Sequence, residues 1–260
     1  DKALADFKRA LKLDPRSTDV LGSLGQTYQA MERSDKAIEQ YNRIIKLEPK
    51  SGFAYNNRAM LYQEKGELLK AHADFRKAMR FSPAESSVYN NFGLLLTGLD
   101  GGAKDAVHFF TYALRLSPRN TLYLYNRGLA YLHAGKPKQA FKDFNEAIKL
   151  DPERGLGYCG RGMANVALGA LEAALDDFTQ AMKWEPPSSE LYCNRAQVYT
   201  DMENYTAALA DYTAAIKADP KCAFAYYNRG AIYQDMGRYP LAKADAAKAL
   251  KLDPNIVREG

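Results

Sequence analysis

The sequence is poor in the residues that mark several classes of protein. Its 260 residues include three cysteines and a single tryptophan, and an odd number of cysteines in a chain this long does not build a disulfide framework. The three histidines show no spacing such as HExxH, and no CxxC pair occurs, so we predict no metal site. No stretch approaches the roughly 18 apolar residues that a membrane span needs, so we predict no membrane association.

The remaining composition is that of an ordinary globular protein. Hydrophobic residues make up 47% of the chain and charged residues 26%. Lys and Arg outnumber Asp and Glu by 36 to 31, and the resulting net charge of +5 is too small to predict a nucleic-acid partner. Free thiols favour a reducing compartment, so we expect a cytoplasmic location.

One short glycine pattern resembles a nucleotide site. The stretch Gly155–Gly160 reads GLGYCG and fits the fingerprint GxGxxG. That fingerprint binds dinucleotides when it follows a strand, whereas here it follows a helical pattern that ends before Pro152. We therefore predict no cofactor and no enzymatic activity for this chain.

The sequence contains a regularly spaced series of prolines. Eight of its eleven prolines are spaced by 34 residues, with one interval of 35, and similar text such as AIKLDP precedes several of them. Proline ends a helix, so each of these positions closes one. The eight are Pro15, Pro49, Pro83, Pro118, Pro152, Pro186, Pro220 and Pro254.

Three columns of residues recur with the same period. Small residues occupy Gly25, Ala59, Gly93, Gly128, Gly162, Ala196 and Gly230. Alanines occupy Ala37, Ala71, Ala106, Ala140, Ala174, Ala208 and Ala242. Aromatic residues occupy Phe7, Tyr41, Phe75, Phe110, Phe144, Phe178 and Tyr212, and the column ends at Ala246. We expect the alanine to face the small residue, where two helices approach closely, and the aromatic side chain to pack against the next repeat.

These columns resemble the tetratricopeptide repeat, which has a period of 34 residues and two helices per repeat. The resemblance implies an all-α, right-handed superhelical solenoid of antiparallel helix pairs, with about seven and a half repeats in one domain over residues 1–260. We expect a half repeat at 1–17, and its missing partner helix suggests a fragment of a longer protein. The expected full repeats are 18–51, 52–85, 86–120, 121–154, 155–188, 189–222 and 223–256.

Paired charges form a further column. Five arginines of the first helices are each followed sixteen residues later by an aspartate, and the aspartate is absent where the arginine is absent. We therefore predict partly buried, structural ion pairs within single repeats. The predicted pairs are Arg58–Asp74, Arg127–Asp143, Arg161–Asp177, Arg195–Asp211 and Arg229–Asp245, whereas Leu24–Gln40 and Phe92–Phe109 stand in the two uncharged repeats.

Family geometry places the outer faces of the first helices on a concave groove. There, five asparagines form a ladder able to bind a peptide backbone, as in the O-linked N-acetylglucosamine transferase family, and Gly160 interrupts it. The asparagine ladder is Asn57, Asn91, Asn126, Asn194 and Asn228. An apolar centre adds Leu122, Tyr125, Leu129, Leu132, Leu156, Met163 and Val166. We expect the same wall to include Met60, Gln63, Glu64, Leu94, Cys193, Gln197 and Phe224.

The asparagine ladder and the apolar centre favour a non-catalytic scaffold that binds a peptide or helix of a partner protein in its groove. The groove positions include no Lys or Arg, which argues against clamping of an acidic chaperone tail. The lysines lie on the second helices and turns without interleaved aromatics, so we predict no nucleic-acid binding. The alternatives are a substrate-recognition arm of a larger enzyme and a structural protein that self-associates through open repeat ends.

Three smaller expectations concern single places in the chain. Trp184 occupies the column of Leu150 and Leu252, so we predict that it belongs to the core. Cys159 and Cys193 share a column of adjacent repeats, so we expect them to approach each other. The 35-residue repeat carries its extra residue in the turn 99–105, where we predict a local irregularity.

Overall fold

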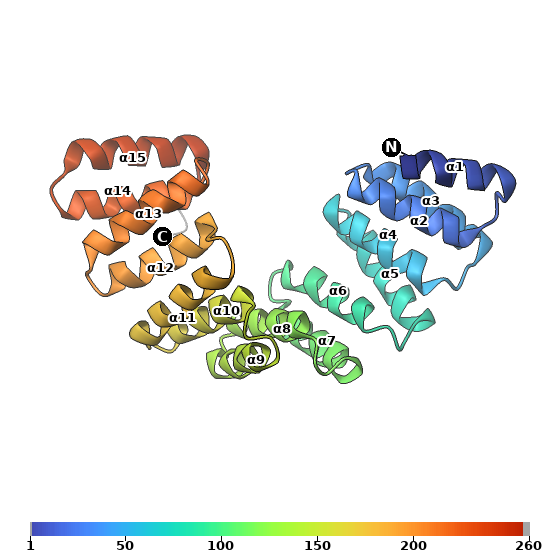
Figure 1. The fold of residues 1–260 in the computed structure, drawn as a ribbon, viewed down its shortest axis with the longest axis horizontal. Helices are drawn as coiled ribbons and strands as arrows, with labels where there is room; N and C mark the ends of the chain where they lie inside the picture. The colour runs from blue at the N-terminus through green and yellow to red at the C-terminus, as the bar shows by residue number, and fades with distance from the viewer. Residues whose placement is uncertain (1, 257–260) are drawn as a thin grey trace. The chain divides into compact units, whose positions relative to one another are not determined.

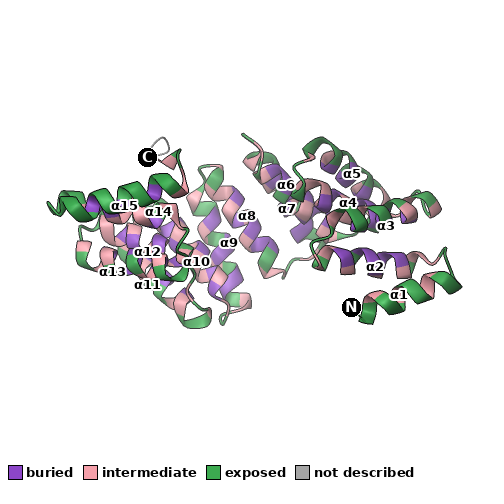
Figure 2. Ribbon diagram, turned by 90° about the horizontal axis from the view of Figure 1, so that it is seen from above, coloured by how far each residue is buried: buried purple, intermediate pink, exposed green. Residues whose placement is uncertain are grey.

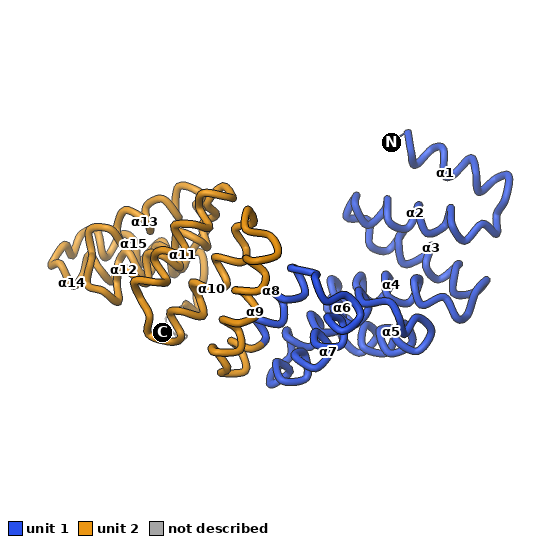
Figure 3. Tube along the Cα trace, turned by 60° about the horizontal axis from the view of Figure 1, so that its bottom comes forward, with its two compact units in different colours: residues 1–130 blue, residues 131–260 orange. Residues whose placement is uncertain are grey.

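The computed structural model describes residues 2–256, and within this range it contains fifteen α-helices and no strand. The chain forms two compact units, residues 1–130 and 131–260, coloured separately in Figure 3. The boundary falls inside the helix Thr121–His133. The assignment of residues 1–260 to one domain stays a prediction.

The first unit is a row of helices joined by short turns. Consecutive helices from α1 to α7 pack against their neighbours in the chain (Figure 1). These helices are α1 (Lys2–Leu13), α2 (Thr18–Ala30), α3 (Ser34–Leu47), α4 (Gly52–Glu64), α5 (Leu68–Phe81), α6 (Ser86–Thr97) and α7 (Ala103–Leu116), followed by α8 (Thr121–His133), which crosses the boundary.

The second unit repeats this plan. Consecutive helices from α9 to α15 pack against each other. They are α9 (Pro137–Leu150), α10 (Gly155–Ala167), α11 (Leu171–Trp184), α12 (Ser189–Asp201), α13 (Tyr205–Ala218), α14 (Ala223–Asp235) and α15 (Tyr239–Leu252). Every expected full repeat thus contains two helices, and the prediction of an all-α repeat solenoid is confirmed. The superhelical twist and its hand stay predictions. Of the predicted half repeat, Asp1 lies outside the described residues.

Short polar side chains define where the helices begin and end. Ser51 and Ser188 precede α4 and α12, and their hydroxyls accept hydrogen bonds from backbone amides of the first turn. After α13, the Asp219 carboxylate accepts from the amide of Lys221 at 2.9 Å, across the intervening proline. Because proline cannot continue a helix and aspartate stabilises the turn, the recurring Asp-Pro text folds into the link between repeats.

The aromatic column forms the centre of the packing. From Tyr41 to Tyr212 its side chains are at most 1% exposed, and Figure 2 shows buried residues along the helix faces that meet other helices. A Cβ atom on Gly93 would lie 2.7 Å from the ring of Phe110. Here the aromatic ring, rather than the predicted alanine, lies nearest to the small residue, because the larger ring fills the space that glycine leaves. At Gly230, whose repeat has no aromatic residue in this column, the added Cβ would instead lie 3.4 Å from the carbonyl oxygen of the predicted Ala242.

The same rings also reach the following repeat. Tyr41 lies edge-on to Phe53 of the next repeat, with ring centroids 6.1 Å apart. A Cβ atom on Gly160 would lie 2.3 Å from the Phe144 ring of the preceding repeat. One aromatic side chain thus links three helices, since it contacts its own repeat and the next.

The 35-residue repeat is irregular, as predicted. Its first helix, α6, has 12 residues where the others of its kind have 13. Five residues, 98–102, separate it from α7, and Gly101 has a φ of 73°. At Gly102 a Cβ atom would lie 2.0 Å from the Leu96 carbonyl oxygen, so only glycine fits this tight turn.

The prediction that Trp184 belongs to the core is wrong. It is the last residue of α11, and it is 44% exposed. Leu116, in the same column, is 38% exposed. The column lies at the ends of the second helices beside the turns, where no neighbouring helix fully covers a side chain.

Candidate functional site

In the first unit, the expected groove face carries an open pocket of about 340 Å³ between α4 and α6. All five residues that line it belong to the predicted wall, although only Asn91 is in the asparagine ladder. They are Met60, Gln63, Glu64, Asn91 and Leu94. These side chains, placed on one wall from their helical positions, thus lie together in the structure, and their role in binding stays a prediction.

The second unit carries a pocket of about 330 Å³ with a largely apolar lining. None of the described residues that line it is charged. Seven of them were predicted for the groove wall: Leu132, Met163, Val166, Cys193, Asn194, Gln197 and Phe224. Three others were missed, namely Ala167, Phe178 and Val198, because they contribute from a helix end or from the buried core. We call this the α10–α12 pocket.

The asparagine ladder does not consist of equivalent amides. Asn57 and Asn228 each donate to a backbone carbonyl of their own helix, at 2.8 and 2.9 Å. Asn91 donates to Asn56 Oδ1 at 3.3 Å. Asn126 is buried and donates to Asn90 Oδ1 at 2.8 Å, so it does not present the free amide that the ladder requires.

Asn194 differs from the other four. Its Nδ2 atom is buried and has no hydrogen-bond partner among the described residues, while its side chain lines the α10–α12 pocket. A buried donor without a partner costs about 1–3 kcal/mol. Asn194 is therefore the member of the ladder whose described amide lacks the kind of partner that the other four have.

The predicted apolar centre is brought together only in part. Leu132, Met163 and Val166 meet in the α10–α12 pocket. Leu156 is half-buried on α10. Leu122, which is 41% exposed, Tyr125 and Leu129 belong to the first unit, so their continuity with the pocket stays a prediction.

Four of the predicted arginine–aspartate pairs are present as close contacts. Their shortest N···O distances are 2.6 Å for Arg58–Asp74 and Arg161–Asp177 and 2.7 Å for Arg195–Asp211 and Arg229–Asp245. In each pair two guanidinium nitrogens donate to one carboxylate, and the aspartate side chain is at most 10% exposed. The Arg127–Asp143 pair would join the two units and stays a prediction.

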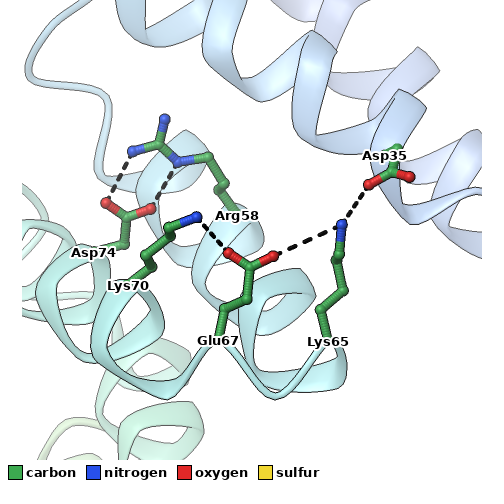
Figure 4. A network of polar contacts seen from close by, with 6 residues as sticks. All are labelled: Asp35, Arg58, Lys65, Glu67, Lys70 and Asp74. Atoms are coloured by element: carbon green, nitrogen blue, oxygen red, sulfur yellow. Dashed lines mark hydrogen bonds and ion pairs between the residues drawn. The ribbon is translucent and has the colours of Figure 1, made fainter.

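The hydrogen bond to the aspartate raises the pKa of the arginine further, as at Arg195 and Arg229, so the guanidinium remains charged. Figure 4 contrasts the Arg58–Asp74 pair with surface ion pairs around the α4–α5 turn, where Lys70 approaches Glu67. Such exposed pairs contribute at most about 1 kcal/mol. The buried pairs therefore hold the two helices of a repeat together and serve a structural role.

A third contact of these arginines was missed. The remaining nitrogen, Nη1, donates to the side chain sixteen residues earlier, on the second helix of the preceding repeat. The acceptors are Asn42, Thr111, Asn145, Thr179 and Thr213 for Arg58, Arg127, Arg161, Arg195 and Arg229. The signal was in the sequence, because this column holds Lys8 and Arg76 before the two repeats that lack the arginine.

In the 35-residue repeat, one of the two without the charged pair, an aromatic pair replaces it. Phe92 and Phe109 lie edge to face with centroids 4.7 Å apart, and Phe75 approaches Phe92 at 5.8 Å. His72 also approaches Phe92, at 5.1 Å. An apolar contact thus fills the place of the ion pair in this repeat.

The thiols are free, and Cys193 approaches Cys222, with the two Sγ atoms 3.9 Å apart. The approach of Cys159 to Cys193 stays a prediction. Burial, together with Glu190 and Glu185, raises the pKa of the Cys159 thiol to about 12. Over residues 2–256, no group of three or more His, Cys, Asp or Glu side chains is placed to hold a metal ion. In the same part of the chain, no helix has the length and apolarity to cross a membrane.

Comparison with solved structures shows the fold. A tetratricopeptide repeat protein from Parabacteroides merdae is 20% identical, with a TM-score of 0.77 over 94% of this chain and 96% of that chain. The APC/C hetero-tetramer Cut9–Hcn1 contains a chain that is 17% identical, with a TM-score of 0.76 over 97% of this chain and 49% of that one. YrrB, described as a TPR protein with an unusual peptide-binding site, is 19% identical, with a TM-score of 0.55 over 69% of this chain and 92% of its own.

Comparison of the sequence gives the family. No curated protein matches it significantly. Family models of the tetratricopeptide repeat match residues 1–57, 54–85, 122–154 and 223–256, and a further TPR repeat model matches residues 196–237. With its recurring columns, helix pairs and arginine–aspartate contacts, the chain belongs to the tetratricopeptide repeat family.

Proposed function

We propose that this chain is a non-catalytic scaffold that binds a partner protein through an extended peptide on the groove face of its first helices. The observation that carries the proposal is the α10–α12 pocket, where an apolar lining surrounds the unpartnered Nδ2 of Asn194. An apolar concavity with a few placed polar groups is the common form of a binding site.

The lining specifies the chemistry of the bound segment. Met163, Val166 and Phe224 offer contact to one large apolar side chain. Asn194 can donate to a backbone carbonyl of the peptide, and Gln197 lies beside it on the same helix. Because no charged residue lines the pocket among those described, the side chain that enters it is expected to be uncharged.

The family relationship supports protein binding in general, without pointing to a particular pocket. YrrB is described as having a peptide-binding site, and Cut9–Hcn1 is an assembly of two proteins. Both are similar to this chain in fold. A partner that docks as a helix, and a contribution of the apolar centre around Leu129, belong to the same proposal.

The experiment is selection of a random peptide library against the folded chain, followed by fluorescence anisotropy with the enriched peptides. Val166→Lys places a charge in the α10–α12 pocket and is expected to weaken binding at least about tenfold. Asn194→Ala is expected to weaken it by a smaller factor. Ala173→Lys, on the exposed side of α11, adds the same charge elsewhere and serves as the matched control.

The expected enrichment is for peptides with one large apolar residue. If Val166→Lys and Ala173→Lys bind the selected peptides equally well, while circular dichroism shows both to be folded, the pocket is not the binding site. A failure to enrich any sequence would count against peptide binding by this chain.

A further inference from the structure

Two of the three thiols lie close together in the second unit. Cys193 is on α12, and Cys222 is the N-cap residue of α14, 29 residues later. Their Sγ atoms are 3.9 Å apart. A disulfide needs about 2.0 Å between the sulfurs, so the two sulfurs, both free thiols already in contact, would have to move closer to bond.

The two thiols have different surroundings. Cys193 is 5% exposed, and burial, followed by the nearby Cys222, raises the pKa of its thiol to about 12. Cys222 is half-buried in the turn before α14, so solutes reach it from solvent. Cys222, the more accessible of the two residues, therefore meets an oxidant first, and the buried Cys193 sulfur lies beside it as the resolving thiol.

We propose that Cys193 and Cys222 form a redox-responsive pair that closes to a disulfide when the protein meets a peroxide. Cys222, as thiolate, attacks one peroxide oxygen; the S–O bond forms, the O–O bond breaks and the leaving hydroxide takes up a proton to become water. The Cys193 sulfur then attacks the sulfenic sulfur of Cys222. The S–S bond forms, the S–O bond breaks and the departing hydroxide leaves as water with the Cys193 proton, so that two thiols and one peroxide give one disulfide and two waters.

The disulfide would act on the structure around it. It would close a loop that contains the rest of α12, all of α13 and the turn before α14, and such a link stabilises a fold by restricting the unfolded chain. Cys193 also lines the α10–α12 pocket. Drawing its sulfur towards Cys222 would change that lining, so oxidation is expected to alter peptide affinity; this second part rests on the proposed function.

The test treats the folded chain with hydrogen peroxide, blocks remaining thiols with N-ethylmaleimide and identifies linked peptides by mass spectrometry. We expect one peptide pair joined through Cys193 and Cys222, reversible by dithiothreitol, and a melting temperature several degrees higher than that of the reduced chain. Cys159→Ser should behave as wild type, whereas Cys222→Ser should show neither the link nor the shift.

Recovery of Cys193 alkylated and Cys222 over-oxidised or joined to a second chain, with the fold intact, would overturn the proposal. The effect of oxidation on peptide affinity is measured separately. If the disulfide forms and a selected peptide binds unchanged, the link to the pocket is wrong. If no peptide can be selected, the proposed function fails, but the mass-spectrometric result still decides whether the thiol pair closes.

Discussion

At the scale of the residue, single arginines of the first helices connect three helices. Arg195 donates through Nε and Nη2 to Asp211 and through Nη1 to Thr179. Asp211 is 7% exposed, so its carboxylate depends on this partner for compensation of its charge. One side chain therefore joins two helices of its own repeat to the repeat before it.

Arg195→Met is expected to lower the free energy of unfolding by about 3 kcal/mol, because it leaves the Asp211 carboxylate buried without its partner. Equilibrium urea unfolding followed by circular dichroism measures the change. Lys149→Met is the control, since Lys149 pairs with Glu146 at the surface, where 65% and 51% of the two side chains are exposed, and its loss should be below about 1 kcal/mol.

Adding Asp211→Leu to Arg195→Met should recover part of the lost stability, because the stranded charge is then removed. Equal losses for Arg195→Met and Lys149→Met would show that the buried pair contributes no more than a surface pair.

The residue scale also shows what the sequence could and could not predict. The arginine–aspartate columns were readable because both partners change together within one chain, as at Phe92 and Phe109. The asparagines were not, since Asn57 and Asn126 share a column and yet one bonds its own helix while the other is buried against Asn90. Side-chain rotation decides that difference, and residue type alone does not determine it.

At the scale of the element, close contacts between helices depend on glycine. Gly160 lies in α10 where a Cβ atom would come within 2.3–2.8 Å of three ring atoms of Phe144. That ring is fully buried and has no room to withdraw. The gap that Gly160 makes in the asparagine ladder is therefore required by packing between repeats, which the sequence presented only as an interruption.

Gly160→Ala is expected to destabilise the fold by about 2 kcal/mol through overpacking. The midpoint of urea unfolding measures the loss. Gly98→Ala is the matched control, because its added methyl group would approach nothing closer than the Leu95 carbonyl oxygen at 3.5 Å and its backbone is right-handed. That change should stay within about 0.5 kcal/mol; a similar loss at both glycines would mean that the clash with Phe144 is relieved without cost.

At the scale of the whole molecule, contacts run between neighbours in the chain. Within each unit, the helices pack mainly on the helix before and the helix after, as at α12, α13 and α14. The stability of such an array is close to a sum over repeats and their interfaces. The length of each repeat, the period and the order of the helices could be predicted from the sequence, because the same residue pattern recurs in every repeat. The identity of the partner does not follow from the fold.

A local defect should therefore stay local. In Arg195→Met, hydrogen exchange is expected to accelerate by roughly a hundredfold in α12 and α13, which corresponds to the loss of about 3 kcal/mol. The amides of α4 and α5 in the first unit should keep their wild-type rates. Acceleration of the same size in α4 and α5 would show that the chain unfolds as one cooperative body, contrary to the nearest-neighbour arrangement of its contacts.

The hydrogen bond from Nη1 of each arginine to the preceding repeat limits the order in which repeats can be joined. Thr179 and Thr213 present the same acceptor, so the repeats that follow them could be duplicated or exchanged by recombination without loss of this bond. Arg76 would instead place a second positive charge against an arginine of the following repeat, and the chain has Phe92 there. Duplication of the repeats after Asn145 is therefore compatible with the interface chemistry, whereas an insertion directly after Arg76 must begin with a repeat that lacks the arginine.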